Sequence, residues 1–470
     1  MVNRFAAVGI AATLGLTGCA EVGPGYHPPK QSVANDPLAN GPFVAGGAAV
    51  ALDEPPDHWW KLYDDARLDA LVERALAANT DLRIADANLE HAHALLAVAR
   101  TIGEANGSID GQTTWTQPSG EQVLQHVAEK PRESYNIGIG VSYDLDLFGA
   151  IRRGVEAAAA DQDAATAARD LVRVNVAAET TRAYADICNT GHEIAALDRV
   201  LVLQQESLRL TSEMVAHGRS APLDQDRQIS ILESARARLP QLQARQRNAA
   251  FRLATLQGQA PEALDTDFLA CSRPLRTLAR LPVGDGQALL KRRPDVRAAE
   301  RRLAAATARI GVVTASLYPD VKLAASIGST GASPDFLTPF TNRYAIGPLV
   351  GWNLRQSTTR ARIAGAEADT KARLAAFDGV VLSALRETET ALDTYCADLE
   401  QLQRLEAARD GARRAEAQIR KLHDGGRAGG LALADAQRSS ALAEQSVASA
   451  ETTISNDQIA AFLALGGGWR

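Results

Sequence analysis

The sequence predicts a mainly α-helical protein with a smaller membrane part made of β-strands. Long stretches of the 470-residue chain have the seven-residue apolar repeat of coiled coils. Four shorter stretches alternate apolar residues with polar or small ones, which is the period of a strand with two different faces. The second half of the chain also matches the first, which indicates an internal duplication.

Composition excludes some classes of partner. The formal net charge is −6 and charged residues make up 23%, so no basic surface favours nucleic acid, and we expect none as a partner. Aromatic residues make up only 5%, which is low for a compact globular core. No run of 18 apolar residues occurs, so the sequence predicts no transmembrane helix.

The N-terminus predicts export and lipidation. Residues 1–18 hold one basic residue, Arg4, and an apolar run from Phe5 to Leu16, which is typical of a signal peptide. The following "LTGC" resembles the bacterial lipobox, so we expect Cys19 to become the lipidated first residue of the mature chain. Several acyl chains on Cys19 would anchor it stably in lipid. The alternative is an ordinary signal peptide with a cysteine near its end. We expect no cofactor beyond this covalent lipid.

Three further cysteines remain, at Cys188, Cys271 and Cys396. An odd number cannot all pair internally. We expect them to be small buried hydrophobic side chains, with a disulfide as the alternative.

The internal duplication has a measurable offset. Shifting the chain by 208 residues superposes Cys188 on Cys396 and the Gly218-Arg219 pair on Gly426-Arg427. We therefore divide the chain into a signal peptide (1–18), an extended arm (19–57), a first repeat (58–260), an equatorial linker (261–287) and a second repeat (288–470). Each repeat is expected to contain a helix, a strand pair, a very long helix, a turn and a returning helix.

The long helices are predicted by heptad spacing. In the first repeat, the seam consists of Ile187, Ile194, Leu201, Leu208 and Val215. No proline interrupts the range 149–216, so this helix is expected to be on the order of 100 Å long. Glycine-containing turns at 217–224 and 424–432 are expected to reverse the chain.

The strands are expected at 108–116, 135–148, 318–329 and 343–354. Each is about long enough to cross a bilayer when tilted. In the second strand, Ile137, Ile139 and Val141 are expected to face lipid, and Asn136, Ser142 and Asp144 a wet lumen. A charge at Ile139 should therefore harm assembly more than a charge at Gly140. Because four strands cannot close a barrel, several copies of the chain must share one.

The chain resembles the bacterial outer-membrane efflux proteins, the TolC-like channels, and in particular the lipidated NodT-type component of RND efflux systems. The matching motifs are "VGPGYHPP" (22–29), "WW" (59–60), "LDALVERALAANTDLR" (68–83), "DLFG" (146–149), "RRPDVRAAERRLAAATARIG" (292–311), "ADAQR" (434–438) and "LGGGW" (465–469). One departure is Thr80, where the family usually has proline, and another is "NLRQSTTR" (353–360) after the last strand.

The resemblance implies a homotrimer with a 12-stranded barrel in the outer membrane of a Gram-negative bacterium. A helical tunnel would extend into the periplasm, with a belt formed by residues 266–288 and the helix after Trp59. The partners implied are a periplasmic membrane-fusion adaptor, an inner-membrane RND transporter and outer-membrane lipid.

The resemblance also implies site residues. Leu431, Asp435 and Arg438 lie at i, i+4 and i+7, on one helical face, and match positions that narrow the periplasmic mouth in related channels. In a trimer they would give rings of three acids and three bases. The alternative is a solvated helical face. The turns, including Gly218, Arg219, Gly426 and Arg427, are the expected adaptor contacts.

The function expected is that of an exit duct that passively conducts drugs, toxic compounds or metals delivered by a pump. No nucleophile, nucleotide or zinc motif occurs, so we expect neither an enzyme nor a metal site. His91 and His93, at i and i+2, do not share a helical face. Two alternatives remain: a duct for protein secretion, and a coiled-coil envelope lipoprotein without a pore.

Overall fold

The computed structural model describes residues 21–117, 119, 127, 130–263, 266–277 and 280–467. The signal peptide, Cys19 and Trp469 lie outside these ranges. The chain forms two compact units, each built from both sequence halves. Unit 1 comprises residues 1–29, 89–164 and 299–376, and unit 2 comprises residues 30–88, 165–298 and 377–470. In the described part, no helix combines the length and apolar character needed to cross a membrane.

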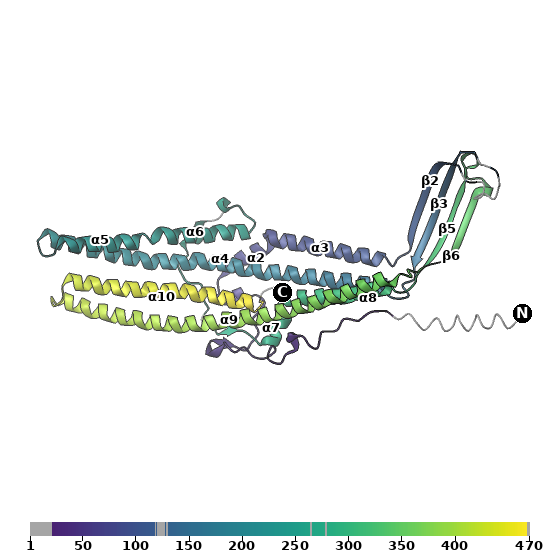
Figure 1. Ribbon diagram of the computed structural model, residues 1–470. Coiled ribbons are helices and arrows are strands. Elements are labelled where there is room, and N and C mark those ends of the chain that lie inside the picture. The colour runs from purple at the N-terminus through teal and green to yellow at the C-terminus, as the bar shows by residue number, and fades with distance from the viewer. Residues whose placement is uncertain are drawn as a thin grey trace. The chain divides into compact units, whose positions relative to one another are not determined.

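Unit 1 contains a four-stranded antiparallel sheet (Figure 1). Its strands are β2 (Asn106–Thr116), β3 (Arg132–Asp144), β5 (Asp320–Ala332) and β6 (Asn342–Gly351). Their order in the sheet is β2-β3-β5-β6. All four strands predicted from period-two alternation are therefore present. Within the described ranges, β2 and β6 each have only one strand neighbour, so the sheet has two open edges.

The last strand ends earlier than predicted, at Gly351 rather than Leu354. Trp352 leaves the ladder because its Nε1 donates a hydrogen bond to the carbonyl of Leu317, at 3.0 Å. Asn353 then accepts a hydrogen bond from the backbone N–H of Arg355, at 3.0 Å, and helix α9 starts at Gln356. Side-chain contacts, rather than the alternation itself, fix this strand end.

Helices precede both strand pairs. α3 (Thr80–Thr101) leads to β2, and α8 (Pro294–Ala315) leads to β5. Asn79 caps α3, because its Oδ1 accepts hydrogen bonds from the N–H groups of Asp81 and Leu82. Thr80 and Pro294 both occupy the first helical position, whose N–H needs no helical partner, so threonine and proline are both compatible with it.

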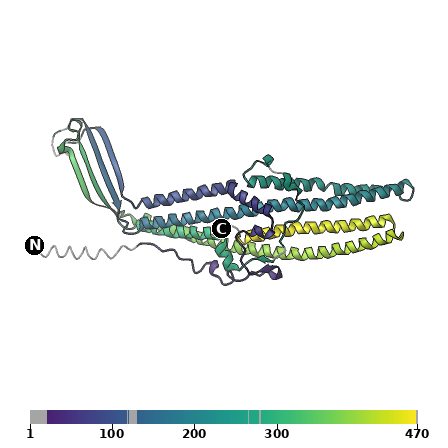
Figure 2. The ribbon, with the colours of Figure 1, turned by 180° about the vertical axis from the view of Figure 1, so that it is seen from behind.

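Unit 2 contains the helical hairpins. α4 (Ala150–Ala216) and α9 (Gln356–Asp424) are the two long helices, and part of each belongs to this unit. α5 (Pro222–Arg236) and α6 (Leu239–Leu256) return along α4, and α10 (Gly430–Ala464) returns along α9 (Figure 2). The predicted seam packs as expected, since Leu197 and Leu201 of α4 are buried against Leu232 of α5. The first returning helix is broken at Ala237-Arg238, where one helix was expected.

The shorter elements complete both units. They are α2 (Ala66–Ala78), α7 (Gly286–Arg292), β1 (Val50–Ala51), β4 (Leu281–Pro282), and the 3-10 turns η2 (Val33–Asn35), η3 (Gly47–Ala49), η4 (Trp59–Tyr63), η5 (Pro261–Ala263), η6 (Thr266–Ala270), η7 (Ser333–Asp335) and η8 (Pro339–Thr341). β1 and β4 pair in parallel. Trp59 is fully buried and stacks on Phe462, with ring centroids 4.7 Å apart. Within the arm, η2, η3 and β1 are the regular elements of the described residues.

Four helices end in the same way. Gly218, Gly258, Gly426 and Gly466 all have φ between +66° and +69°. In each case the N–H of the following residue bonds to a carbonyl five residues back, as in Arg219 to Met214 and Arg427 to Leu422. These are Schellman motifs, which favour glycine because of the left-handed backbone. Gly218 and Gly426, like Gly258 and Gly466, are 208 residues apart, so helix ends repeat at the offset found in the sequence.

The expectation for the cysteines was wrong in part. Cys188 and Cys271 form a disulfide, with Cα atoms 4.7 Å apart, and Cys396 is free. The pairing depends on the close approach of residues 266–277 to α4. A Cβ on Gly191 would lie 2.0 Å from the carbonyl oxygen of Cys271, so glycine makes this approach possible.

Candidate functional site

The two faces of the sheet differ sharply. The strand register places Ile109, Ile139, Ile327 and Tyr344 in one row across all four strands. Their exposed fractions are 79%, 53%, 65% and 85%. Further apolar residues on the same face are Ile137, Val141, Leu323, Ile346 and Val350. An exposed apolar surface of this extent is typical of a surface that meets lipid or another protein.

The opposite face is polar. It carries Asn136, Ser142 and Asp144, as the alternation predicts. Asn136 Oδ1 accepts hydrogen bonds from Arg343, at 2.7 Å, and from Thr330, at 2.8 Å. Nearer the helices, Lys322 Nζ lies 2.8 Å from a carboxylate oxygen of Asp144.

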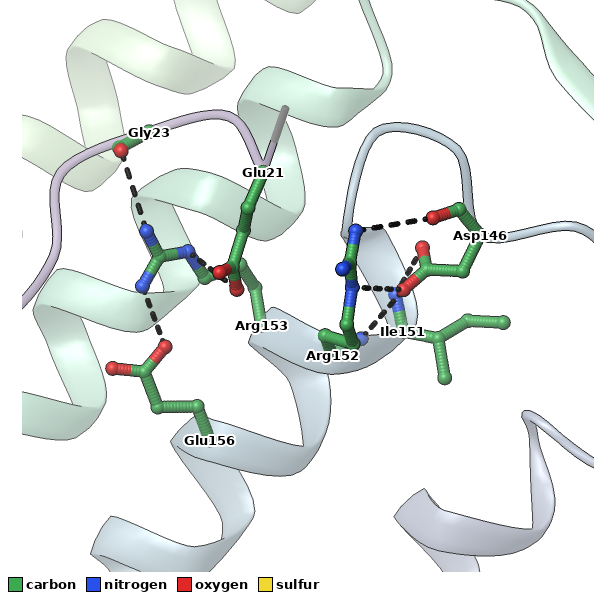
Figure 3. Close-up of polar contacts among 7 residues, drawn as sticks. All are labelled: Glu21, Gly23, Asp146, Ile151, Arg152, Arg153 and Glu156. Atoms are coloured by element: carbon green, nitrogen blue, oxygen red, sulfur yellow. Dashed lines mark hydrogen bonds and ion pairs between the residues drawn. The ribbon is translucent and has the colours of Figure 1, made fainter. Parts of the chain in front are cut away.

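The "DLFG" motif joins β3 to α4. Asp146 accepts hydrogen bonds from the N–H groups of Ile151 and Arg152, both at 3.0 Å, and so caps the new helix (Figure 3). Phe148 stacks on Tyr318, with ring centroids 4.5 Å apart. Gly149 has φ +80°, and a Cβ there would lie 2.8 Å from Glu21. Each residue of the motif except Leu147 thus has a defined structural role.

The N-terminal arm lies against this junction. Arg153 Nε is 3.2 Å from Glu21, and the Arg153 side chain is only 8% exposed (Figure 3). The same guanidinium contacts Glu156 and the carbonyl of Gly23. The N–H of Val22 donates to the carbonyl of Phe148, at 3.2 Å. The chain is therefore held in place from the second residue after Cys19 onward.

A close backbone contact brings the arm to α8. A Cβ on Gly23 would lie 2.5 Å from the Cα of Gly311, and a Cβ on Gly311 would lie 2.9 Å from the carbonyl oxygen of Val22. Both positions therefore require glycine. This explains Gly23 in "VGPGYHPP" and Gly311 at the end of "RRPDVRAAERRLAAATARIG".

The predicted tip residues lie together. The α4–α5 turn holds Gly218 and Arg219, and the α9–α10 turn holds Gly426 and Arg427, at the same end of unit 2 (Figure 1). All four residues are exposed. The two hairpins also meet behind the turns, where a Cβ on Gly430 would lie 3.7 Å from Leu210.

The predicted gate residues begin α10. Leu431 is 40% exposed, and Asp435 and Arg438 form an ion pair with each other, one turn apart. All three residues follow the α9–α10 turn. The spacing alone predicts separate rings of acids and bases and does not predict this pairing.

A family model described as "Outer membrane efflux protein" matches residues 71–259 and 286–467. The chain belongs to the outer membrane efflux protein family. Among curated relatives, Nodulation protein T of Rhizobium leguminosarum bv. trifolii is 28% identical over 80% of this chain and 79% of its own length. Outer membrane protein OprJ of Pseudomonas aeruginosa is 28% identical over 99% of this chain and 97% of its own length.

A solved structure agrees with the family. The outer-membrane channel OprN is 34% identical and has a TM-score of 0.85, with 95% of this chain and 99% of OprN covered. The fold of this efflux protein is thus that of the TolC-like channels, and its location is the outer membrane.

The efflux protein also contains structural contacts that its sequence motifs do not predict. Arg292 and Arg293, in the "RRPDVR" motif, donate to the carbonyls of Leu465 and Ala464 at the end of α10. Arg293 is also paired with Asp295 and Glu387. Guanidinium donors thus satisfy carbonyls that a helix end leaves without partners.

The described ranges hold no candidate metal centre. They contain no group of three or more His, Cys, Asp or Glu side chains placed to hold an ion. His91 and His93 both lie on α3 with exposed side chains.

Proposed function

We propose that this protein is the exit duct of a tripartite efflux system, which passively conducts small molecules across the outer membrane. The observation that carries the proposal is the sheet, whose one face is apolar and exposed and whose other face is polar. A wet pore through lipid requires this arrangement. A coiled-coil spacer without a pore has no use for it.

The duct is a homotrimer. Open edges at β2 and β6 leave backbone N–H and C=O groups unpaired, at a cost of several kcal/mol each in lipid. Pairing β6 of one copy with β2 of the next removes both edges. The usual smallest barrel has eight strands, so two copies reach only the lower limit. Three copies give the 12-stranded barrel implied by the resemblance to TolC-like channels.

Lipid on Cys19 adds a second attachment to the membrane. The ion pair of Arg153 with Glu21 supports this, because it holds the arm beside the ends of β3 and β5. Acyl chains on Cys19 would therefore enter the bilayer close to the base of the barrel.

The tip turns of unit 2 receive the partners. The exposed turns with Gly218, Arg219, Gly426 and Arg427 are the contacts for a periplasmic membrane-fusion adaptor, which links the duct to an inner-membrane RND transporter. Leu431, Asp435 and Arg438, next to these turns, form the periplasmic gate. The transporter supplies the energy, and the duct carries out no chemistry.

Conductance of the purified protein in planar bilayers tests the proposal. We expect trimers that conduct poorly at rest and better after Asp435→Ala. Trimers that conduct under no condition, the Asp435→Ala variant included, would overturn it. Drug, solvent and metal sensitivity of a deletion strain then identifies the cargo class.

A further inference from the structure

Two charged residues lie in one row of the polar face. Asp110 on β2 is opposite Gly138 on β3, Gly138 is opposite Gly328 on β5, and Gly328 is opposite Arg343 on β6. Side chains that face each other across strands project from the same side of a sheet. The row therefore reads acid, glycine, glycine, base, one step along the strands from the apolar row that contains Ile139.

Gly138 leaves space for the guanidinium. A Cβ on Gly138 would lie 3.0 Å from Arg343 Nη2, so the arginine side chain reaches back over β3 toward β2. It is held there by two neutral partners. Nε donates to Thr330 at 2.9 Å, and Nη2 donates to Asn136 at 2.7 Å.

Neither charge of the row is neutralised by a direct ion pair within the described ranges. Asp110 accepts a hydrogen bond from Ser108, at 3.2 Å, and the partners of Arg343 are uncharged. By contrast, Lys322 on the same face is paired with Asp144 and Asp320. That cluster is six residues away along β5, or about 20 Å, which is roughly two Debye lengths at physiological salt.

We infer that the Asp110–Arg343 row determines whether the duct prefers cations or anions. The inference rests on the proposed function, because the polar face must line a pore. In a trimer, three fixed carboxylates and three fixed guanidinium groups would alternate around the lumen. Anionic solutes would be attracted at Arg343 and cationic solutes at Asp110, so the balance of the two sets the ion preference.

The test is the K⁺/Cl⁻ permeability ratio of single channels in a KCl gradient. Arg343→Gln leaves the carboxylate uncompensated, so the ratio should rise by about twofold or more. Asp110→Asn should lower it by a similar factor, and the double variant should return close to wild type. Arg343→Lys is the matched control, since it keeps the charge and should keep the wild-type ratio.

The outcomes separate this inference from the proposed function. If wild-type trimers conduct but both single variants keep the wild-type ratio, the row does not discriminate charge and the inference is overturned. A change in Arg343→Lys as large as in Arg343→Gln would also overturn it, because the effect would then be structural. If wild-type protein forms no channel, the proposed function itself fails.

Discussion

Arg153 and Glu21 form an ion pair that fixes the N-terminal arm to the first turns of α4, with Arg153 Nε 3.2 Å from the carboxylate. The arginine is nearly buried, whereas the side chain of Glu21 is 38% exposed. Buried guanidinium groups need all their partners, so this contact is a structural determinant of where residues 21–23 lie.

Replacing Arg153 by alanine should release the arm. We expect a loss of about 1–2 kcal/mol, below the value for a fully buried pair because the carboxylates are partly solvated. Thermal unfolding in detergent and protease cleavage within residues 21–57 measure the two effects. Arg152→Ala is the matched control, since its side chain is 49% exposed and Asp146 still caps α4 without it. Equal effects of the two variants would contradict the assignment.

The ion pair of Asp435 with Arg438 should affect passage and not folding. Both side chains are solvent-accessible, so the pair stabilises the protomer by about 0–1 kcal/mol at most. Asp435→Ala should therefore leave the melting temperature unchanged and increase single-channel conductance. Glu400→Ala, which removes a more exposed pair with Arg404 on α9, is the control and should change neither. A conductance increase in both variants would show that surface charge in general is responsible.

Local patterns predicted most of the elements. Strand alternation identified β2, β3, β5 and β6, because side-chain direction follows the backbone directly. The ends depend on contacts that no local pattern contains, as Trp352 shows by bonding to Leu317. The proline-free range 149–216 likewise predicted α4 to its last residue, Ala216. The helix ends there because Gly218 follows with a positive φ.

Long-range pairings at the site could not be predicted in this way. Cys188 and Cys271 are 83 residues apart, and their pairing depends on the missing side chain of Gly191. Spacing placed Asp435 and Arg438 on one face, but which of their neighbours each would bind is decided by rotamers. Predicting that Asp110 and Arg343 share a row requires the register of three strand pairs.

The disulfide should stabilise unit 2. Cys271→Ser should lower the free energy of unfolding by about 2–4 kcal/mol, since the bond closes a long loop. Thiol labelling of the denatured mature protein, in which the proposed lipid would block Cys19, should find one thiol per chain, Cys396, and two in the variant. Cys396→Ser is the control, with none. Three labelled thiols in unreduced wild type would show that the bond does not form.

Asp457 should make stability depend on pH. Burial, together with a hydrogen bond to Asp398, raises its pKa to about 7. The folded chain then holds a proton that the unfolded chain releases above pH of about 4, so this contribution to stability falls as pH rises from about 4 to 7. We expect a difference of about 1 kcal/mol, because solvent screens part of the carboxyl.

Unfolding midpoints at pH 5 and pH 8 measure the pH dependence of stability that Asp457 causes. Asp457→Asn should remove it, while Asp369→Asn, an exposed carboxyl paired with Arg373 on α9, should keep it. If Asp457→Asn retains the full difference, another group is responsible.

The two faces of β3 should respond differently to the same charge. Ile139→Lys places an ammonium on the apolar face, at a cost of about 2–4 kcal/mol if that face lies at the bilayer midplane. Ser142→Lys, three residues along the same strand, places it on the polar face, where water solvates it. We expect the first variant to reduce trimer in outer-membrane fractions several-fold and the second to leave it near wild type. Equal yields would mean that the apolar face meets water rather than lipid, because burial in apolar surroundings would make the charge costly at Ile139 alone.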